Sequence, residues 1–118
     1  MISYGMLRKK QLPVRKYVFQ EGRRELADWI TTYGGIHFFP LDPEADKIEI
    51  TDVAHALSLI CRGNGHVKTF FSVGQHCIHC ALEAEARGYG SRIALACLLH
   101  DAGEAYMSDV PRPFKQHL

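Results

Sequence analysis

The feature that most constrains the fold is an apolar run that ends in a histidine and an aspartate side by side. Residues 95–99 (LACLL) are all apolar, and His100 and Asp101 follow at once, with Glu104 and Asp109 close behind. A charge in a protein interior is heavily penalised unless it is paired or bound to a metal. A helix that carries these groups toward a core must give them partners, so the stretch predicts a site that performs chemistry.

The spacing of apolar residues predicts an all-α domain. Helices are expected over residues 21–33, 51–61, 73–87 and 91–107. Thr51, Ser72 and Ser91 are suitable N-caps, and Gly34-Gly35 and Gly88 are suitable stops. Between these helices we expect a short extended piece at Ile48–Ile50, a glycine-bearing turn at residues 62–66, and a stop at the SDVPRP sequence. The helix over 91–107 is apolar all round at residues 93–99 and is therefore expected to be buried.

The helix over residues 73–87 has one apolar face that also carries a histidine. Residues at three- and four-residue intervals share a helix face, and here they are Val73, His76, Cys77, Cys80 and Ala84. A single histidine on such a face is more often a core residue than a ligand. An antiparallel neighbour would nevertheless bring His100 and Asp101 to the same place as His76. Imidazole nitrogens with a carboxylate oxygen suit a divalent transition metal, whereas a plain His–Asp hydrogen bond at a helix end is the alternative.

Three motifs occur together between Thr51 and Lys115: CRGNGH, SVGQHC and HDAGEAYMSDVPRPFK. In this combination the sequence resembles the HD-domain metal-dependent phosphohydrolases, and most closely their 5'-deoxynucleotidase-like branch of bacterial or phage type. The stretch up to about Asp46 resembles, less closely, the arm and first helix of a subgroup. The resemblance implies an HD-type helical bundle over residues 21–118, after a basic arm at residues 1–20. It also implies hydrolysis of a phosphate monoester, a (deoxy)nucleoside 5'-monophosphate, by a metal-activated water.

The resemblance implies a role for each residue of the motif. His76, His100 and Asp101 match metal ligands, and Glu104 matches the acid that handles protons near the attacking water. The implied cofactor is a divalent ion, one of Mn, Co, Fe, Ni, Zn or Mg. Such an ion lowers the pKa of bound water and neutralises developing charge. Glu104 lies three and four residues past Asp101 and His100, hence on the same side of a helix, although it could also be a solvated helix-end acid.

Three further residues are expected near a small phosphorylated substrate. Arg62 matches a phosphate-gripping arginine, and its planar fork suits phosphate oxygens. Asp109 matches a carboxylate near the sugar of a bound nucleotide and is counted with both the catalytic and the substrate-binding groups. His55 could line the pocket, where it would either support another site residue or donate a hydrogen bond to phosphate. Two of these residues have a simpler interpretation, because Arg62 suits a helix C-terminus and Asp109 suits a turn before Pro111.

The HCIHC sequence at residues 76–80 raises the alternative of structural zinc. Closed zinc sites usually pair such a half-site with a second one, and the other cysteines, Cys61 and Cys97, stand singly. Cys77 and Cys80 also fall on the apolar face, where free cysteine packs as a small hydrophobe. The pattern therefore favours free thiols. His66, in the glycine turn, is expected to be exposed.

Charge and hydropathy exclude several classes of partner. The formal net charge is +1, residues 1–20 lack the apolar core of a signal peptide, and no stretch has the length of a membrane span. A cytoplasmic protein with reduced thiols and no membrane partner is expected. Residues 1–20 contain Arg8, Lys9, Lys10, Arg15 and Lys16 and no acid. We interpret this arm as solvated and expect no nucleic-acid partner, the weaker alternative being salt-sensitive binding of nucleic acid.

The end of the sequence predicts an HD domain that is truncated at the C-terminus. The family pattern requires a later aspartate ligand, and no acid follows Asp109. The metal site would then lack one protein ligand, and the alternative function is an inactive or weakly active module that binds a metal or ligand. A groove between helices 73–87 and 91–107 would expose apolar surface, so a homo-oligomer is expected.

Overall fold

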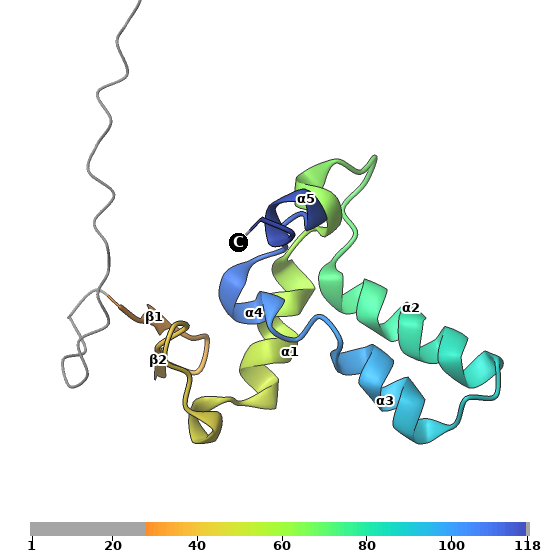
Figure 1. Ribbon diagram of the computed structural model, residues 1–118, viewed down its shortest axis with the longest axis horizontal. Helices are drawn as coiled ribbons and strands as arrows, with labels where there is room; N and C mark the ends of the chain where they lie inside the picture. Colours follow the sequence, from red (N-terminus) through yellow and green to blue (C-terminus); the bar gives the residue numbers. More distant parts are fainter. Residues whose placement is uncertain (1–27, 118) are drawn as a thin grey trace, which may run out of the picture.

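The computed structural model describes residues 28–117 as a mostly helical chain with one small hairpin (Figure 1). Its elements are β1 (Ile30–Thr31), β2 (His37–Phe38), η1 (Ala45–Lys47), α1 (Ile50–Leu59), η2 (Arg62–Gly65), α2 (Val73–Ala86), α3 (Ser91–Leu99), α4 (Glu104–Met107) and α5 (Arg112–Lys115). The predicted all-α class is confirmed for these residues. The basic arm predicted at residues 1–20 lies outside the described part. None of the described helices combines the length and the apolar character needed to cross a membrane.

The start of the described chain is a hairpin, so the helix predicted over residues 21–33 is wrong where it can be compared. β1 pairs antiparallel with β2, with Ile30 opposite Phe38. Gly35 has a φ of 83° in the connecting turn, a conformation that favours glycine. The Gly34 amide donates to Asp52 Oδ1 at 2.7 Å. A Cβ on Gly34 would lie 2.9 Å from that oxygen, so glycine allows the hairpin to dock on α1.

α1 and α2 form close to where the sequence predicts them. The N-cap of α1 is Glu49 rather than the predicted Thr51, and Ile50 begins the helix instead of ending an extended piece. The Ser72 cap of α2 is confirmed, because its Oγ accepts from the Gln75 amide at 3.0 Å. The Gln75 side-chain oxygen accepts from the Ser72 amide at 2.9 Å in return. This reciprocal pair is a capping box, and it fixes the start of the helix that carries His76.

Loss of this cap should destabilise the fold measurably. Ser72→Ala is expected to lower the free energy of unfolding by about 1 kcal/mol, since it removes an N-cap acceptor. Ser91→Ala is the matched control, because the N-cap of α3 is Gly90 and not the predicted Ser91. Urea unfolding followed by circular dichroism measures both variants. Equal midpoints for the two variants would contradict the role of the box.

The single helix predicted over residues 91–107 is broken in the structure. α3 ends at Leu99 and α4 begins at Glu104. In between, the Ala102 amide donates to the Leu99 carbonyl and the Glu104 amide to the Asp101 carbonyl, both at 3.0 Å. These bonds span three residues, as in the tighter 3₁₀ turn, in which residues three apart eclipse each other. The break therefore stacks Glu104 on the same side as Asp101.

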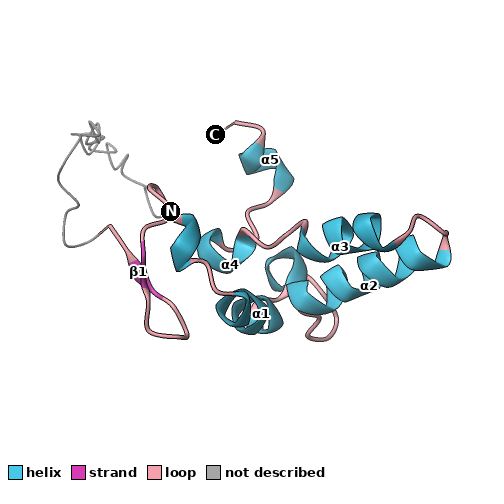
Figure 2. Cartoon of the chain, turned by 90° about the horizontal axis from the view of Figure 1, so that it is seen from below, coloured by secondary structure: helices cyan, strands magenta, loops and turns pink. Residues whose placement is uncertain are grey.

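The core lies where α1, α2 and α4 meet. Its buried members are Val53, Leu57, Val73 and Cys77, with Ile60, Ala102, Ala105 and Tyr106 packed against them. α3 lies alongside α2 (Figure 2), and the expectation that it is buried all round is wrong. Of its residues only Ala94 is buried, whereas Leu95 and Leu99 are 55% and 42% exposed. One neighbouring helix covers one face, and among the described residues the other faces of α3 remain uncovered.

Candidate metal centre

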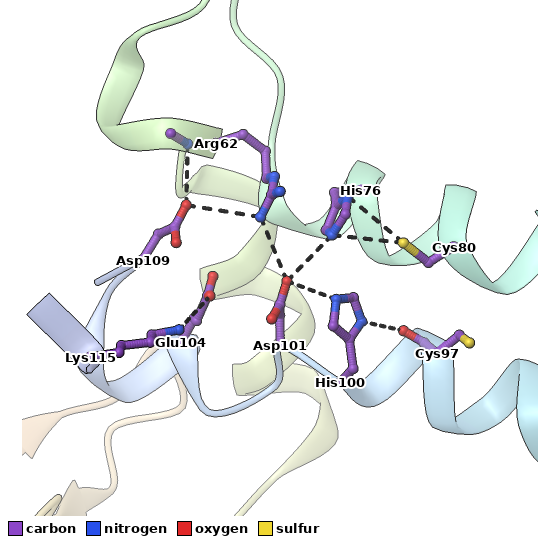
Figure 3. A network of polar contacts seen from close by, with 10 residues as sticks. Arg62, His76, Cys80, Cys97, His100, Asp101, Glu104, Asp109 and Lys115 are labelled. Carbon is purple, nitrogen blue, oxygen red and sulfur yellow. Dashed lines mark hydrogen bonds and ion pairs between the residues drawn. The ribbon is translucent and has the colours of Figure 1, made fainter. Parts of the chain in front are cut away.

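Two helices bring the three predicted ligands together. α2 supplies His76, and the turn that follows α3 supplies His100 and Asp101 (Figure 3). Asp101 Oδ2 lies 3.5 Å from His76 Nε2 and 3.1 Å from His100 Nε2. Ligand atoms bonded to one tetrahedral ion at 2.0–2.1 Å stand about 3.4 Å apart. Each imidazole–carboxylate pair therefore has the spacing of two ligands on one ion, although His76, His100 and Asp101 do not together form one of the groups of described residues whose ligand atoms all lie within 4.8 Å of one another.

Hydrogen bonding and burial orient both imidazoles for metal binding. His100 Nδ1 contacts the Cys97 carbonyl oxygen, which can only accept, so Nδ1 carries a proton and Nε2 is the nitrogen directed at Asp101. Such a bond to the outer nitrogen is the usual support for a metal-ligating histidine. Burial, and then the nearby Arg62 guanidinium, lower the pKa of His76. A lowered pKa favours the neutral ring, which is the form that coordinates metals.

Cys77 and Cys80 also belong to groups of side chains that could bind a metal ion. Among residues 28–117, two groups of three ligand atoms lie within 4.8 Å of one another and could hold a metal ion: His76, Cys80 and His100, and Cys77, His100 and Asp101. The sequence interpretation assigned both cysteines to packing. Cys77 fits that assignment, because it is buried in the core and burial raises the pKa of its thiol. Cys80 was missed as a cluster member, although its position one helical turn after His76 is a visible signal.

Arg62 and Asp109 border the cluster on the side of the glycine turn. The Arg62 amide donates to the Phe71 carbonyl at 2.8 Å, which fixes the residue just after α1. Its Nη1 lies 3.7 Å from Asp101 Oδ2 and 4.0 Å from Asp109 Oδ2. Both distances exceed those of a hydrogen bond, so these acids orient the guanidinium without using up its donors. Asp109 also accepts from the Gly63 amide at 3.1 Å, which braces the turn.

Glu104 is a buried acid beside this cluster. It is 5% exposed, and its Oε1 lies 3.6 Å from Lys115 Nζ on α5. Its Oε2 is buried with no hydrogen-bond partner among the described atoms. Burial, and then the charges of Asp101 and Asp109, raise the pKa of the carboxyl, while Lys115 partly opposes the rise. A carboxyl with a raised pKa is suited to exchanging a proton near neutral pH. The role of Lys115 was missed, although the residue stands in the quoted motif.

The remaining predicted site residue lies in a different environment. His55 stacks on Tyr33, with ring centroids 3.7 Å apart and an interplanar angle of 10°. This contact ties α1 to the turn of the hairpin. A substrate-binding role for His55 therefore stays a prediction without a supporting contact. His66 is exposed, as predicted.

The fold and the site define a helical protein with a cluster of His, Cys and Asp side chains that could hold a metal ion. No family model matches the chain. It is 40% identical over 90 residues to the uncharacterized protein YfdR of Escherichia coli K12. It is 38% identical over 91 residues to an uncharacterized protein of Rhodobacter capsulatus. These matches cover 76% and 74% of this chain and 48% and 46% of the relatives, so the chain spans about half the length of the curated relatives it matches.

Proposed function

We propose that this chain is part of a metal-dependent phosphohydrolase that cleaves a phosphate monoester, a (deoxy)nucleoside 5'-monophosphate. One observation carries the proposal. The Asp101 carboxylate lies between two imidazoles and also within 3.7 Å of the Arg62 guanidinium. The two imidazoles that would bind a metal and the arginine that would bind phosphate are therefore all neighbours of the Asp101 carboxylate. The sequence resemblance to the HD-domain phosphohydrolases supports the same function.

Each side chain has a defined task in this proposal. His76, His100 and Asp101 would hold the divalent ion, which acidifies bound water and offsets the developing negative charge. Arg62 binds the phosphate oxygens through its planar fork. Glu104 holds or releases a proton close to the leaving oxygen, since it is aligned with Asp101 by the turn between α3 and α4. Asp109 positions the Arg62 turn, and its carboxylate is available to a sugar hydroxyl.

A phosphate-release screen tests the proposed function. The 118-residue protein is freed of metal and incubated with a panel of nucleoside and deoxynucleoside 5'-monophosphates. Each is paired in turn with Mn, Co, Fe, Ni, Zn or Mg. We expect release of inorganic phosphate that depends on one or a few of these ions and stops with a chelator. If no ion and no substrate gives release, the proposed activity is wrong.

A binding-only role would leave a different signature. In that case the protein would bind metal and nucleotide in titration calorimetry without any phosphate release. The alternative of a metal- or ligand-binding module would then replace the enzyme.

Arg62→Lys should weaken substrate binding rather than folding. A lysine keeps the charge but loses the fork, so at least one charge-assisted hydrogen bond to phosphate is lost. Such a bond is worth about 1.5–3 kcal/mol, so KM should rise by roughly 10- to 100-fold. Steady-state kinetics measures the change, and Arg87→Lys on the exposed side of α2 is the matched control. A loss of stability with unchanged KM would instead favour the helix-end interpretation of Arg62.

A further inference from the structure

We propose that the Cys80 sulfur is a ligand of this metal centre, which makes it a mixed imidazole–thiolate site selective for zinc or cobalt over manganese and magnesium. The inference rests on the metal centre of the proposed function but not on phosphate hydrolysis. It assigns a role to Cys80, one of the two cysteines in the HCIHC sequence at residues 76–80. The mechanism proposed above uses neither cysteine.

The spacing of Cys80 and His76 is that of two ligands to one ion. Both lie on α2, one helical turn apart, so their side chains point to the same side. Cys80 Sγ lies 3.7 Å from His76 Nε2. Sulfur at 2.3 Å and nitrogen at 2.0–2.1 Å from one tetrahedral zinc stand about 3.5 Å apart. His100, directly after α3, completes a group whose ligand atoms all lie within 4.8 Å of one another, and Figure 3 shows the three side chains close together.

The contact between Cys80 and His76 is not a well-directed hydrogen bond. The sulfur lies 3.8 Å from Nδ1 as well as 3.7 Å from Nε2. It is therefore almost equally far from both nitrogens and is not aligned with the lone pair of either. A thiol that donated to the ring would approach one nitrogen and leave the other. Neither nitrogen of the ring is therefore committed to the thiol, and a rotation of the His76 ring or of the Cys80 side chain would bring both side chains to one ion.

Access separates Cys80 from its neighbour Cys77. Cys80 is half-buried and lines an open groove of about 390 Å³ between α2 and α3, together with Ala84, Ile93 and Cys97. Cys77 is 2% exposed and packs against Val73 and the α1 core. Cys77 thus fills the packing role that the sequence analysis gave to both cysteines. Cys80 keeps a sulfur that an incoming ion can reach.

A thiolate ligand determines which metal the site prefers. Soft sulfur favours zinc and similar transition metals, whereas manganese and magnesium prefer oxygen ligands. With Cys80 the donor set becomes two nitrogens and one sulfur, and the Asp101 carboxylate is adjacent to both imidazoles. The same centre without Cys80 would offer only nitrogen and oxygen.

Cobalt(II) spectroscopy of the 118-residue protein tests this ligand directly. The metal-free protein is titrated with cobalt(II) alone, and the near-ultraviolet sulfur-to-cobalt charge-transfer band is recorded beside the visible d–d bands. We expect the wild type and the Cys97→Ala control to show the charge-transfer band. Cys80→Ala and Cys80→Ser should lose it and keep d–d bands. Asp101→Asn should retain it even if hydrolysis stops.

Competition titrations give the matching change in affinity. Cys80→Ala should weaken zinc binding by more than the roughly 10- to 100-fold lost with an outer-shell partner, with little change for manganese. A wild-type cobalt spectrum with d–d bands but no sulfur band would overturn the inference and leave the proposed function intact. Loss of the band in Cys77→Ala but not in Cys80→Ala would also overturn it. No cobalt binding at all would overturn both this inference and the metal centre of the proposed function.

Discussion

Glu104→Gln should abolish phosphate release while the metal stays bound. A positioned general acid or base contributes about 10²- to 10⁴-fold to a rate, and glutamine matches the size of glutamate but cannot exchange the proton. Glu104 belongs to neither group of metal-ligand atoms found in the described residues. Phosphate release and elemental analysis on the same preparation measure both properties. Glu83→Gln, at an exposed position on α2, is the control, and wild-type activity in Glu104→Gln would rule the role out.

Unfolding measured at several pH values is expected to report on the buried Glu104 carboxyl independently of activity. Burial, followed by the charges of Asp101 and Asp109, raises the pKa of Glu104 in the folded protein. The stability that this proton contributes is fully present below the ordinary glutamate pKa and is lost as the pH rises through the raised folded value. Glutamine carries no such proton, so Glu104→Gln should lose less stability over this pH range. Urea midpoints measured upward from about pH 4, near the ordinary glutamate pKa, provide the measurement.

The double substitution His100→Ala/Asp101→Ala should remove the metal. It deletes the shared carboxylate and one of the two imidazoles that contact it at 3.5 and 3.1 Å. His76 and Cys80 then remain, too few ligands for a stable site. The affinity should fall by more than the roughly 100-fold that loss of an outer-shell partner can cost.

Elemental analysis after gel filtration measures the metal retained by this double variant. His66→Ala/Asp46→Ala changes the same residue types at exposed positions and should retain the metal fully. A double variant that also keeps its full metal content would disprove the assignment of His100 and Asp101.

The break between α3 and α4 gives the site its layout. In one continuous α-helix, His100, Asp101 and Glu104 would follow a turn of 3.6 residues. The tighter turn at Asp101–Glu104 instead aligns Glu104 with the Asp101 carboxylate and places it beside Ala105 and Tyr106, which pack against the core. One short segment therefore carries both a candidate metal ligand and a buried carboxyl group.

Local sequence determined the parts of this protein that depend on neighbours within a few residues. The Ser72–Gln75 capping box, the buried face of α2 and the stop after Met107 follow from residue type and helical spacing. The approach of His76 to His100 and Asp101 was also predictable, because consecutive helices joined by a short turn usually pack side by side.

Tertiary structure decided the rest. Residues 30–38 pair as a hairpin because Gly34 can approach Asp52 on α1, a contact that no local pattern contains. The exposure of α3 depends on how many elements pack against it, and apolar sequence alone cannot give that number. The same holds for Cys80, since whether a cysteine packs or binds metal depends on what lies opposite it. Cys80 lies on α2 and His100 follows α3, so only the packing of these two helices brings the Cys80 and His100 side chains close together.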